Sequence, residues 1–226
     1  MSRTAAVIVA AGSGTRFGGL KQFASLGGRP LVEWSCEAFQ THPRIDDIVL
    51  VLPETSAKPE YVRCFPKIID VVLGGARRQD SVRAGVERLD ARRTGHVLVH
   101  DGARPLVPAE VIDRVLTAAK NYGGAVPVIF SEDTLKEIDA DRIVRTLDRE
   151  GIGRVQTPQG FTYDLLRRAL AAAFDAGISG PDEASLVEHL GETVAVVLGD
   201  PRNIKITTPL DLIIAEAIRH ENRPGI

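Results

Sequence analysis

Short apolar segments recur along the chain, and segments with helical periodicity separate them. Val, Ile and Leu dominate six runs, at residues 5–10, 47–52, 70–73, 96–100, 125–130 and 194–198. Several runs are apolar at consecutive positions, as in "VLVH" and "VAVVL", which is typical of strands covered on both faces. The alternation predicts βαβ units, and hence an α/β fold with a mostly parallel sheet and helices on both faces.

Helices are predicted between these runs, at residues 30–39, 108–120 and 164–177. Pro30 and Pro108 stand where a first helical residue is expected, a position that needs no amide hydrogen. A further helix is expected after Gly75, and a last one after Pro209.

Residues 133–151 break this rhythm in the middle of the chain. Two short alternating segments flank Asp139, Ala140 and Asp141, which is the pattern of a β-hairpin rather than of a crossover helix. We expect one domain over residues 1–226, from which residues 131–155 protrude as an arm. Because an isolated two-stranded ribbon is marginal in water, the arm should pack on the body or contact a second subunit.

Composition narrows the functional classes. Hydrophobic residues make up 44% of the 226 residues and charged residues 26%, a composition that favours neither a disordered nor a collagen-like chain. The net charge of -2, without a basic run, argues against nucleic-acid binding. Cys36 and Cys64 fall in predicted helical segments without a ligand-spaced neighbour, so reduced thiols are expected. We see no signal-peptide pattern and no membrane-length apolar run, and we expect a cytoplasmic protein.

The first apolar run leads into a glycine-rich loop, "VIVAAGSGTRFGGLKQF". The dinucleotide fingerprint G-x-G-x-x-G fails, because Phe17 stands where the third glycine after Gly12 and Gly14 belongs. The phosphate loop of nucleoside triphosphatases fails as well, because Gly19 is followed by Leu20 rather than by Lys.

Two cations, Arg16 and Lys21, remain on a turn built from small residues. Backbone amides of such a turn can approach phosphate, while Arg offers a two-pronged contact and Lys a mobile charge. The pattern favours binding of a polyphosphate, with a tight turn carrying solvated cations as the alternative.

Polar residues also follow two later strands. Gly75 and Ser81 lie near the start of a helix, where the dipole favours anions, although a capped helix explains them equally well. Asp101 and Arg104 come directly after a buried strand, the position at which open α/β sheets bind ligands. Lys205 interrupts an apolar run and must reach solvent or an anion.

Two polar features are interpreted as structural. His100 is expected to be a packed or turn-stabilising residue. Asp182 and Glu183 resemble a catalytic pair, but adjacent helical residues point in different directions, and we interpret them as a simple helix N-terminus. No His/Cys cluster predicts zinc, and no Ser or Cys has an evident base.

Eight motifs together resemble the 2-C-methyl-D-erythritol 4-phosphate cytidylyltransferase family, in the family's order and over nearly the whole chain. They are "VAAGSGTRFGGLKQF", "GGARRQDSV", "VLVHDGARP", "DTLKE", "LDREG", "QTPQGF", "DEASLVE" and "GDPRNIKITTPLDL". The resemblance implies a Rossmann-like nucleotidyltransferase fold, a homodimer, and transfer of CMP from CTP to methylerythritol phosphate with release of pyrophosphate.

The resemblance also implies roles for individual residues. It gives catalytic roles to Arg16, Lys21 and Lys205. It places the nucleotide against Ala10, Ala11, Gly12, Gly14, Gly74, Gly75, Arg78 and Ser81. It places the second substrate near Asp101, Arg104, Thr134 and Arg149, the last two from the arm of a partner subunit. Mg²⁺ is expected on the triphosphate oxygens with Asp101 as a protein ligand, since a hard cation needs oxygen ligands.

The chain departs from the family pattern at two places. Only four residues separate Arg16 from Lys21, fewer than is usual, and Pro181 stands where a Thr is common. The alternatives are a ribitol 5-phosphate cytidylyltransferase, whose sequences are similar, and a nucleotide-binding module without catalysis. A dinucleotide oxidoreductase ranks last.

Overall fold

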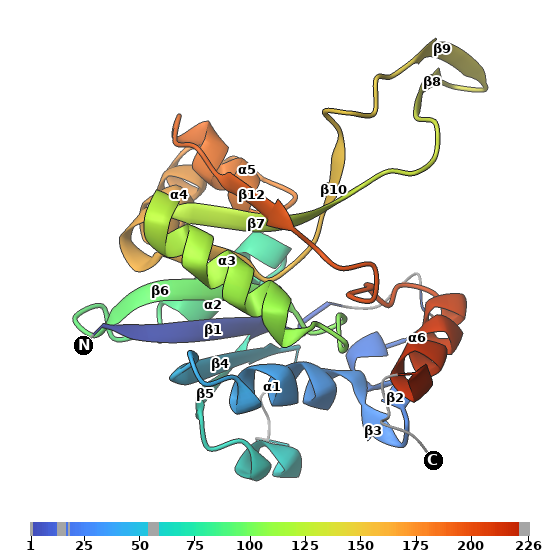
Figure 1. Ribbon diagram of the computed structural model, residues 1–226. Helices are drawn as coiled ribbons and strands as arrows, with labels where there is room; N and C mark the ends of the chain where they lie inside the picture. The colour runs from blue at the N-terminus through green and yellow to red at the C-terminus, as the bar shows by residue number, and fades with distance from the viewer. Residues whose placement is uncertain (1, 13–16, 18, 54–58, 222–226) are drawn as a thin grey trace.

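A computed structural model of the protein describes residues 2–12, 17, 19–53 and 59–221. An eight-stranded sheet forms its centre (Figure 1). The strands are β1 (Arg3–Val9), β4 (Asp47–Leu52), β5 (Ile68–Leu73), β6 (Thr94–Asp101), β7 (Gly124–Phe130), β10 (Gly153–Val155), β11 (Gln159–Thr162) and β12 (Ala195–Leu198). Their order is β10-β7-β11-β6-β1-β4-β5, with β12 beside β7. Only β10 and β11 pair antiparallel with their neighbours, so the predicted mostly parallel sheet is confirmed.

Helices cover both faces of this sheet. They are α1 (Leu31–Thr41), α2 (Arg78–Val86), α3 (Ala109–Tyr122), α4 (Tyr163–Asp175), α5 (Glu183–His189) and α6 (Pro209–Glu221). Ala5 and Val7 of β1 pack with α2, α4 and α5, whereas Ala6 and Ile8 pack with α1 and α3. Because successive residues of a strand point to opposite faces, this double burial explains the unbroken apolar runs.

The predicted elements are confirmed to within two residues at each end, with one correction. Pro30 and Pro108 are N-cap residues that precede α1 and α3, not first helical residues. The sequence did not reveal β10 and β11, which are short and contain polar residues or glycine. These two strands occupy the same edge of β7, and the residues between them lie at the site described below.

The hairpin is confirmed and extends away from the body (Figure 1). It consists of β8 (Lys136–Asp139) and β9 (Arg142–Thr146), and every residue of both strands is exposed. Ala140 makes the turn with a φ of 51°, in the left-handed region. Residues 153–155, which the sequence assigned to the arm, belong to β10 in the main sheet instead.

The last helix holds the N-terminal loop region against the body. The short helix η2 (Lys21–Phe23) leads into a small ladder of β2 (Ser25–Leu26) and β3 (Arg29–Pro30), which lies beside α6 (Figure 1). Glu216 of α6 accepts a hydrogen bond from the Gly27 amide at 2.5 Å, and Arg219 lies over the Trp34 ring. In the described part of the chain, no helix is both long enough and apolar enough to span a bilayer.

Candidate active site

A cavity of about 430 Å³ opens where β1 and β6 end at their carboxyl edge. Neighbouring parallel strands continue in opposite directions from this point, which is where open α/β sheets bind ligands. Nine of the residues proposed from the sequence line this first cavity: Ala10, Ala11, Gly12, Lys21, Gly75, Arg78, Ser81, Asp101 and Lys205. The structure thus brings together residues from four distant parts of the chain.

The backbone after β1 forms one wall. Ala10 donates its amide to Val51 of β4, which anchors the start of the loop. The buried Gln22 side chain donates to the Gly12 carbonyl at 3.2 Å, so the loop is tied to η2 and its Lys21. A Cβ at Gly12 would meet no atom of the described residues within 4 Å, so packing against that part of the chain does not require glycine there. A bare backbone beside an open cavity suits close approach of a ligand.

The start of α2 forms the opposite wall. The Ser81 hydroxyl accepts from the Gly75 amide at 3.1 Å and donates to the Arg77 carbonyl at 3.2 Å. Gly74 is not among the lining residues. Its Cβ would lie 2.2 Å from that of Ala11, so this glycine is needed for packing between the two walls.

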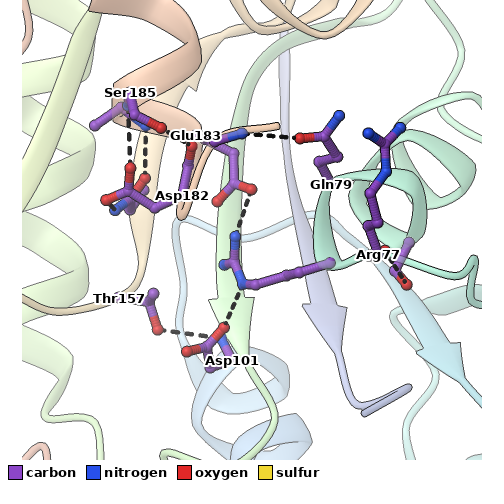
Figure 2. A network of polar contacts seen from close by, with 12 residues as sticks. Arg77, Gln79, Asp101, Thr157, Asp182, Glu183 and Ser185 are labelled. Atoms are coloured by element: carbon purple, nitrogen blue, oxygen red, sulfur yellow. Dashed lines mark hydrogen bonds and ion pairs between the residues drawn. The ribbon is translucent and has the colours of Figure 1, made fainter. Parts of the chain in front are cut away.

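Four side chains of alternating charge form what we call the floor cluster: Glu183, Arg78, Asp101 and Lys205. Figure 2 shows the carboxylates of Glu183 and Asp101 facing each other across an arginine. Nη1 of Arg78 donates to Glu183 at 2.6 Å, and its Nε donates to Asp101 at 3.0 Å. The second oxygen of Asp101 lies 2.7 Å from the Lys205 ammonium.

The two carboxyl groups of the floor cluster respond differently to the same arginine. Burial raises the pKa of Asp101, but the charges of Arg78 and Lys205 outweigh burial and hold it well below its usual range. Burial also raises the pKa of Glu183, and Arg78 offsets only part of that effect. Asp101 is therefore a firmly ionised anchor for the two cations.

His100 lies beneath the floor cluster and is confirmed as a packed residue, with no exposed surface. Its Nε2–H donates to the Arg104 carbonyl at 3.0 Å, and its Nδ1 accepts from the Thr157 hydroxyl at 3.1 Å. That hydroxyl in turn accepts from the Asp101 amide, a contact drawn in Figure 2. Burial lowers the pKa of His100 to about 4, so the ring is neutral at pH 7.

A second cavity, of about 750 Å³, adjoins the first. Lys205 lines both, and Arg104 contributes to the second alone. Arg104 donates to the Asn203 carbonyl at 2.7 Å, while its buried Nε has no hydrogen-bond partner among the described residues. Burial lowers the pKa of Arg104. The two cavities together can hold two ligands that meet at Lys205.

The interpretation of residues 182 and 183 as a simple helix N-terminus is only half right. Asp182 is the N-cap of α5 and accepts from the Ser185 amide at 3.0 Å (Figure 2). Glu183, by contrast, is wholly buried in the floor cluster. The two side chains point in different directions, as expected, and this is why only one of them caps. A helix N-cap needs only one acidic residue, so the presence of Glu183 directly after Asp182 was the signal in the sequence for a second role.

The "QTPQGF" segment, which carries only a resemblance in the sequence, holds two glutamines with structural contacts. Gln156 binds the backbone of Asp200 and Asn203, and Gln159 binds Asp182 and the Ala184 amide. The Gln159 side chain thus joins β11 to α5, and the Gln156 side chain joins the end of β10 to the segment that carries Lys205. Gln156 itself lines the second cavity, so this segment forms part of the site.

The remaining predicted residues lie elsewhere. Thr134 is exposed on the arm and lines neither cavity. Arg149 borders a separate shallow hollow at the base of the arm and donates to the Glu132 carbonyl of its own chain. Gly14 and Arg16 lie outside the described residues.

Among the described residues, the carboxylates near the first cavity fit Mg²⁺ as a single protein ligand, not as a full coordination shell. The described residues contain no group of three or more His, Cys, Asp or Glu side chains that would enclose a metal. Mg²⁺ usually takes one or two carboxylates and completes its shell with water and substrate phosphates. Asp101 fits that pattern as a single protein ligand, because each of its oxygens keeps a second lone pair beside its cation.

Known proteins were compared with the chain and its structure. The family model of IspD, 2-C-methyl-D-erythritol 4-phosphate cytidylyltransferase, matches residues 4–221. The enzyme of that name from Dehalococcoides mccartyi is 44% identical, over 98% of each chain. That from Syntrophotalea carbinolica is 41% identical, over 93% of this chain and 94% of its own. A crystal structure of the Thermus thermophilus enzyme is 38% identical, with a TM-score of 0.82 over 95% of this chain and 98% of its own. The chain belongs to the 2-C-methyl-D-erythritol 4-phosphate cytidylyltransferase family and has that family's α/β nucleotidyltransferase fold.

Proposed function

We propose that this protein transfers CMP from CTP to 2-C-methyl-D-erythritol 4-phosphate, giving 4-diphosphocytidyl-2-C-methyl-D-erythritol and pyrophosphate, in the non-mevalonate isoprenoid pathway. One observation carries the proposal beyond family membership: two cavities adjoin at Lys205. The first, with the bare backbone of Gly12 and the ammonium-bearing Lys21, suits a nucleoside triphosphate. The second, with Arg104, suits a small phosphorylated polyol.

The proposed reaction is an in-line displacement. An oxygen of the acceptor phosphate forms a bond to the α-phosphorus of CTP, while the bond from that phosphorus to the bridging oxygen of pyrophosphate breaks. A phosphate monoester is already largely deprotonated at neutral pH, so no general base is needed. The protein has to position two anions and offset their repulsion. Lys21 is assigned to the triphosphate and Lys205 to the boundary between the reactants.

Mg²⁺ is part of this proposal. Asp101 would hold it together with the triphosphate oxygens, and the ion would offset charge on the triphosphate. The residues of the chain keep separate tasks: the loop at Gly12 contacts phosphate through its amides, and Ser81 fixes the start of α2 beside the nucleotide.

We further propose that the protein acts as a homodimer whose arm reaches the second cavity of the partner. Neither Thr134 nor Arg149 lines the first or the second cavity of its own chain. Ile138, Ile143 and Val144 of the arm are 65%, 65% and 57% exposed, a cluster of apolar side chains that a partner would cover. The cytoplasmic location stays a prediction.

The test is pyrophosphate release from CTP with each of two acceptors, methylerythritol phosphate and ribitol 5-phosphate. We expect turnover with the first and at least about a hundredfold lower kcat/KM with the second, because an active site discriminates between acceptors through its polar contacts. A higher kcat/KM with ribitol 5-phosphate would show that the protein is a ribitol 5-phosphate cytidylyltransferase instead. CTP binding without turnover on either acceptor would favour a module without catalysis.

A further inference from the structure

One carboxylate of the floor cluster lines neither the first nor the second cavity. Glu183 has no exposed surface, and it is not among the residues that line the first or the second cavity. Taking a carboxylate out of water is unfavourable unless a partner compensates it. The compensating partner is Arg78, whose Nη1 lies 2.6 Å from Oε1 of Glu183. The other oxygen, Oε2, is buried and has no hydrogen-bond partner among the described residues, so Arg78 is the hydrogen-bonded group through which Glu183 can act on a ligand.

Arg78 is held from two sides. Its Nη1 donates to Glu183 on α5 and its Nε donates to Asp101 at the end of β6, the two carboxylates labelled in Figure 2. Its Nη2 is buried and has no hydrogen-bond partner in the part of the chain that the structure describes. Two anchors at different edges of a planar guanidinium fix both its position and its rotation. One anchor would leave the group able to turn toward the phosphates of a nucleotide.

The chain of contacts continues to the boundary between the cavities. Because Arg78 binds one oxygen of Asp101, the other oxygen is left for Lys205, at 2.7 Å. Lys205 lines both cavities, so its position affects the approach of the two reactants. Displacement of a reacting group by about 1 Å can cost about a hundredfold in rate.

We propose that Glu183 is a positioning residue for cytidylyl transfer. It holds Arg78 in the floor cluster, so that Asp101 keeps Lys205 at the boundary between the nucleotide and the acceptor. This inference rests on the function proposed above and adds to it a residue that touches neither substrate. The rival explanation is a purely structural ion pair between α5 and α2, which would affect stability alone.

The substitution Glu183→Gln removes the charge and keeps the shape. We expect kcat to fall about tenfold, because a charge-assisted hydrogen bond is roughly twice as strong as a neutral one and Arg78 loses that hold. The KM for CTP should change by a smaller factor than kcat, because Arg78 keeps its bond to Asp101 in the lining of the first cavity. Glu188→Gln is the matched control, because it makes the same change on an exposed position of α5 and should leave both constants unchanged.

A double-mutant cycle separates positioning from stability. In an Arg78→Met background, Glu183→Gln should lower kcat by less than about twofold, because the residue through which it acts is gone. Thermal midpoints are recorded for each variant, and kcat is expressed per folded molecule. An unchanged kcat in Glu183→Gln with a lowered midpoint would overturn the proposal in favour of the structural pair. An equal loss in both backgrounds would also overturn it.

Two further outcomes are informative. If the Arg78→Met proteins do not fold, the comparison of Glu183→Gln with Glu188→Gln decides alone, and a loss confined to the first supports the role. A wild-type protein that forms no product would overturn the proposed function and this role with it. A wild-type protein with turnover, beside a Glu183→Gln variant of equal kcat, would overturn the role of Glu183 alone.

Discussion

The floor cluster and the arm contain ion pairs of nearly equal length in opposite surroundings. Arg78 and Glu183 are 2.6 Å apart and the Glu183 side chain is 0% exposed, whereas Arg145 and Glu137 of the arm are 2.5 Å apart with side chains 69% and 46% exposed. Buried charges depend on their partners, because loss of one leaves the other without water. Exposed charges exchange a partner for water at little cost. Distance alone therefore does not indicate what an ion pair contributes.

The largest expected effect comes from breaking the floor cluster at its centre. Asp101→Ala removes the buried acceptor that Arg78 and the partly exposed Lys205 share. We expect the free energy of unfolding to fall by about 4 kcal/mol, the range for removal of one member of a buried pair. Denaturant unfolding monitored by circular dichroism measures it. A loss below about 1 kcal/mol would mean that water already compensates the cluster.

The second effect concerns the neutral histidine beneath the floor cluster. The pKa of His100 is lowered to about 4, below its value of about 6.5 in an unfolded chain. The unfolded state then binds a proton first as the pH falls, so stability is full above pH 6.5 and is lost toward pH 4. The neutral His100 therefore contributes about 3 kcal/mol at most to the free energy of unfolding.

Unfolding measured between pH 4 and pH 7 tests this pH dependence. In His100→Gln the free energy of unfolding should fall less between pH 7 and pH 4 than in the wild type, even if it is lower at pH 7. His189→Gln, at an exposed position of α5, is the control and should show the same pH dependence of stability as the wild type. An unaltered slope in His100→Gln would show that other groups cause the acid sensitivity.

These buried contacts also mark what the sequence could and could not predict. The strands β1, β4 and β6 were evident because continuous apolar runs are required where both sheet faces are covered. Asp101 and Lys205 were found because a charge inside or after an apolar run needs an explanation. Glu183 was misinterpreted, because its burial depends on Arg78, 105 positions away in the chain. Such a long-range pairing leaves no local pattern in the sequence.

The same limit applies to the arm and to the sheet edge. The hairpin was predictable from two alternating segments around Asp139, Ala140 and Asp141, which is local information. The strands β10 and β11 were not, because they are short and gain their partners only when β7 lies beside them. Of their polar residues, Arg154 lines the second cavity and Gln159 binds the start of α5, whereas Thr162 caps α4.

The third prediction concerns Lys21, a cation of the first cavity that is expected to affect the reaction more than stability. Lys21→Ala should lower kcat about a hundredfold, by analogy with removal of one donor from an oxyanion site. The free energy of unfolding should change by less than about 1 kcal/mol, as for a substitution away from the core. Pyrophosphate release and denaturant unfolding are measured on the same preparation. Normal turnover would remove Lys21 from the mechanism.

The fourth prediction concerns Arg149 and tests whether the arm completes the acceptor site of a partner subunit. Arg149→Ala should raise the KM for the acceptor about tenfold and leave the KM for CTP nearly unchanged, because one charged contact to a ligand contributes about this much. Mixed dimers of Arg149→Ala and Lys21→Ala contain one intact site if the arm crosses between subunits. They should regain activity at low acceptor concentration. No recovery in freshly formed mixed dimers would mean that each chain completes its own site.

The smallest effect is expected for the exposed pair of the arm itself. Arg145→Ala removes a contact as short as that of Arg78 with Glu183, yet the free energy of unfolding should change by less than about 1 kcal/mol, because both partners are largely hydrated. High salt should remove even this difference, since exposed charges are screened. Arg142→Ala, at an exposed pair 3.9 Å apart on the same strand, is the matched control. A loss above about 2 kcal/mol for Arg145→Ala alone would show that the pair is desolvated in solution, as a subunit packed on the arm would cause. In that case burial by a partner, and not the contact within one chain, would set the contribution of the arm.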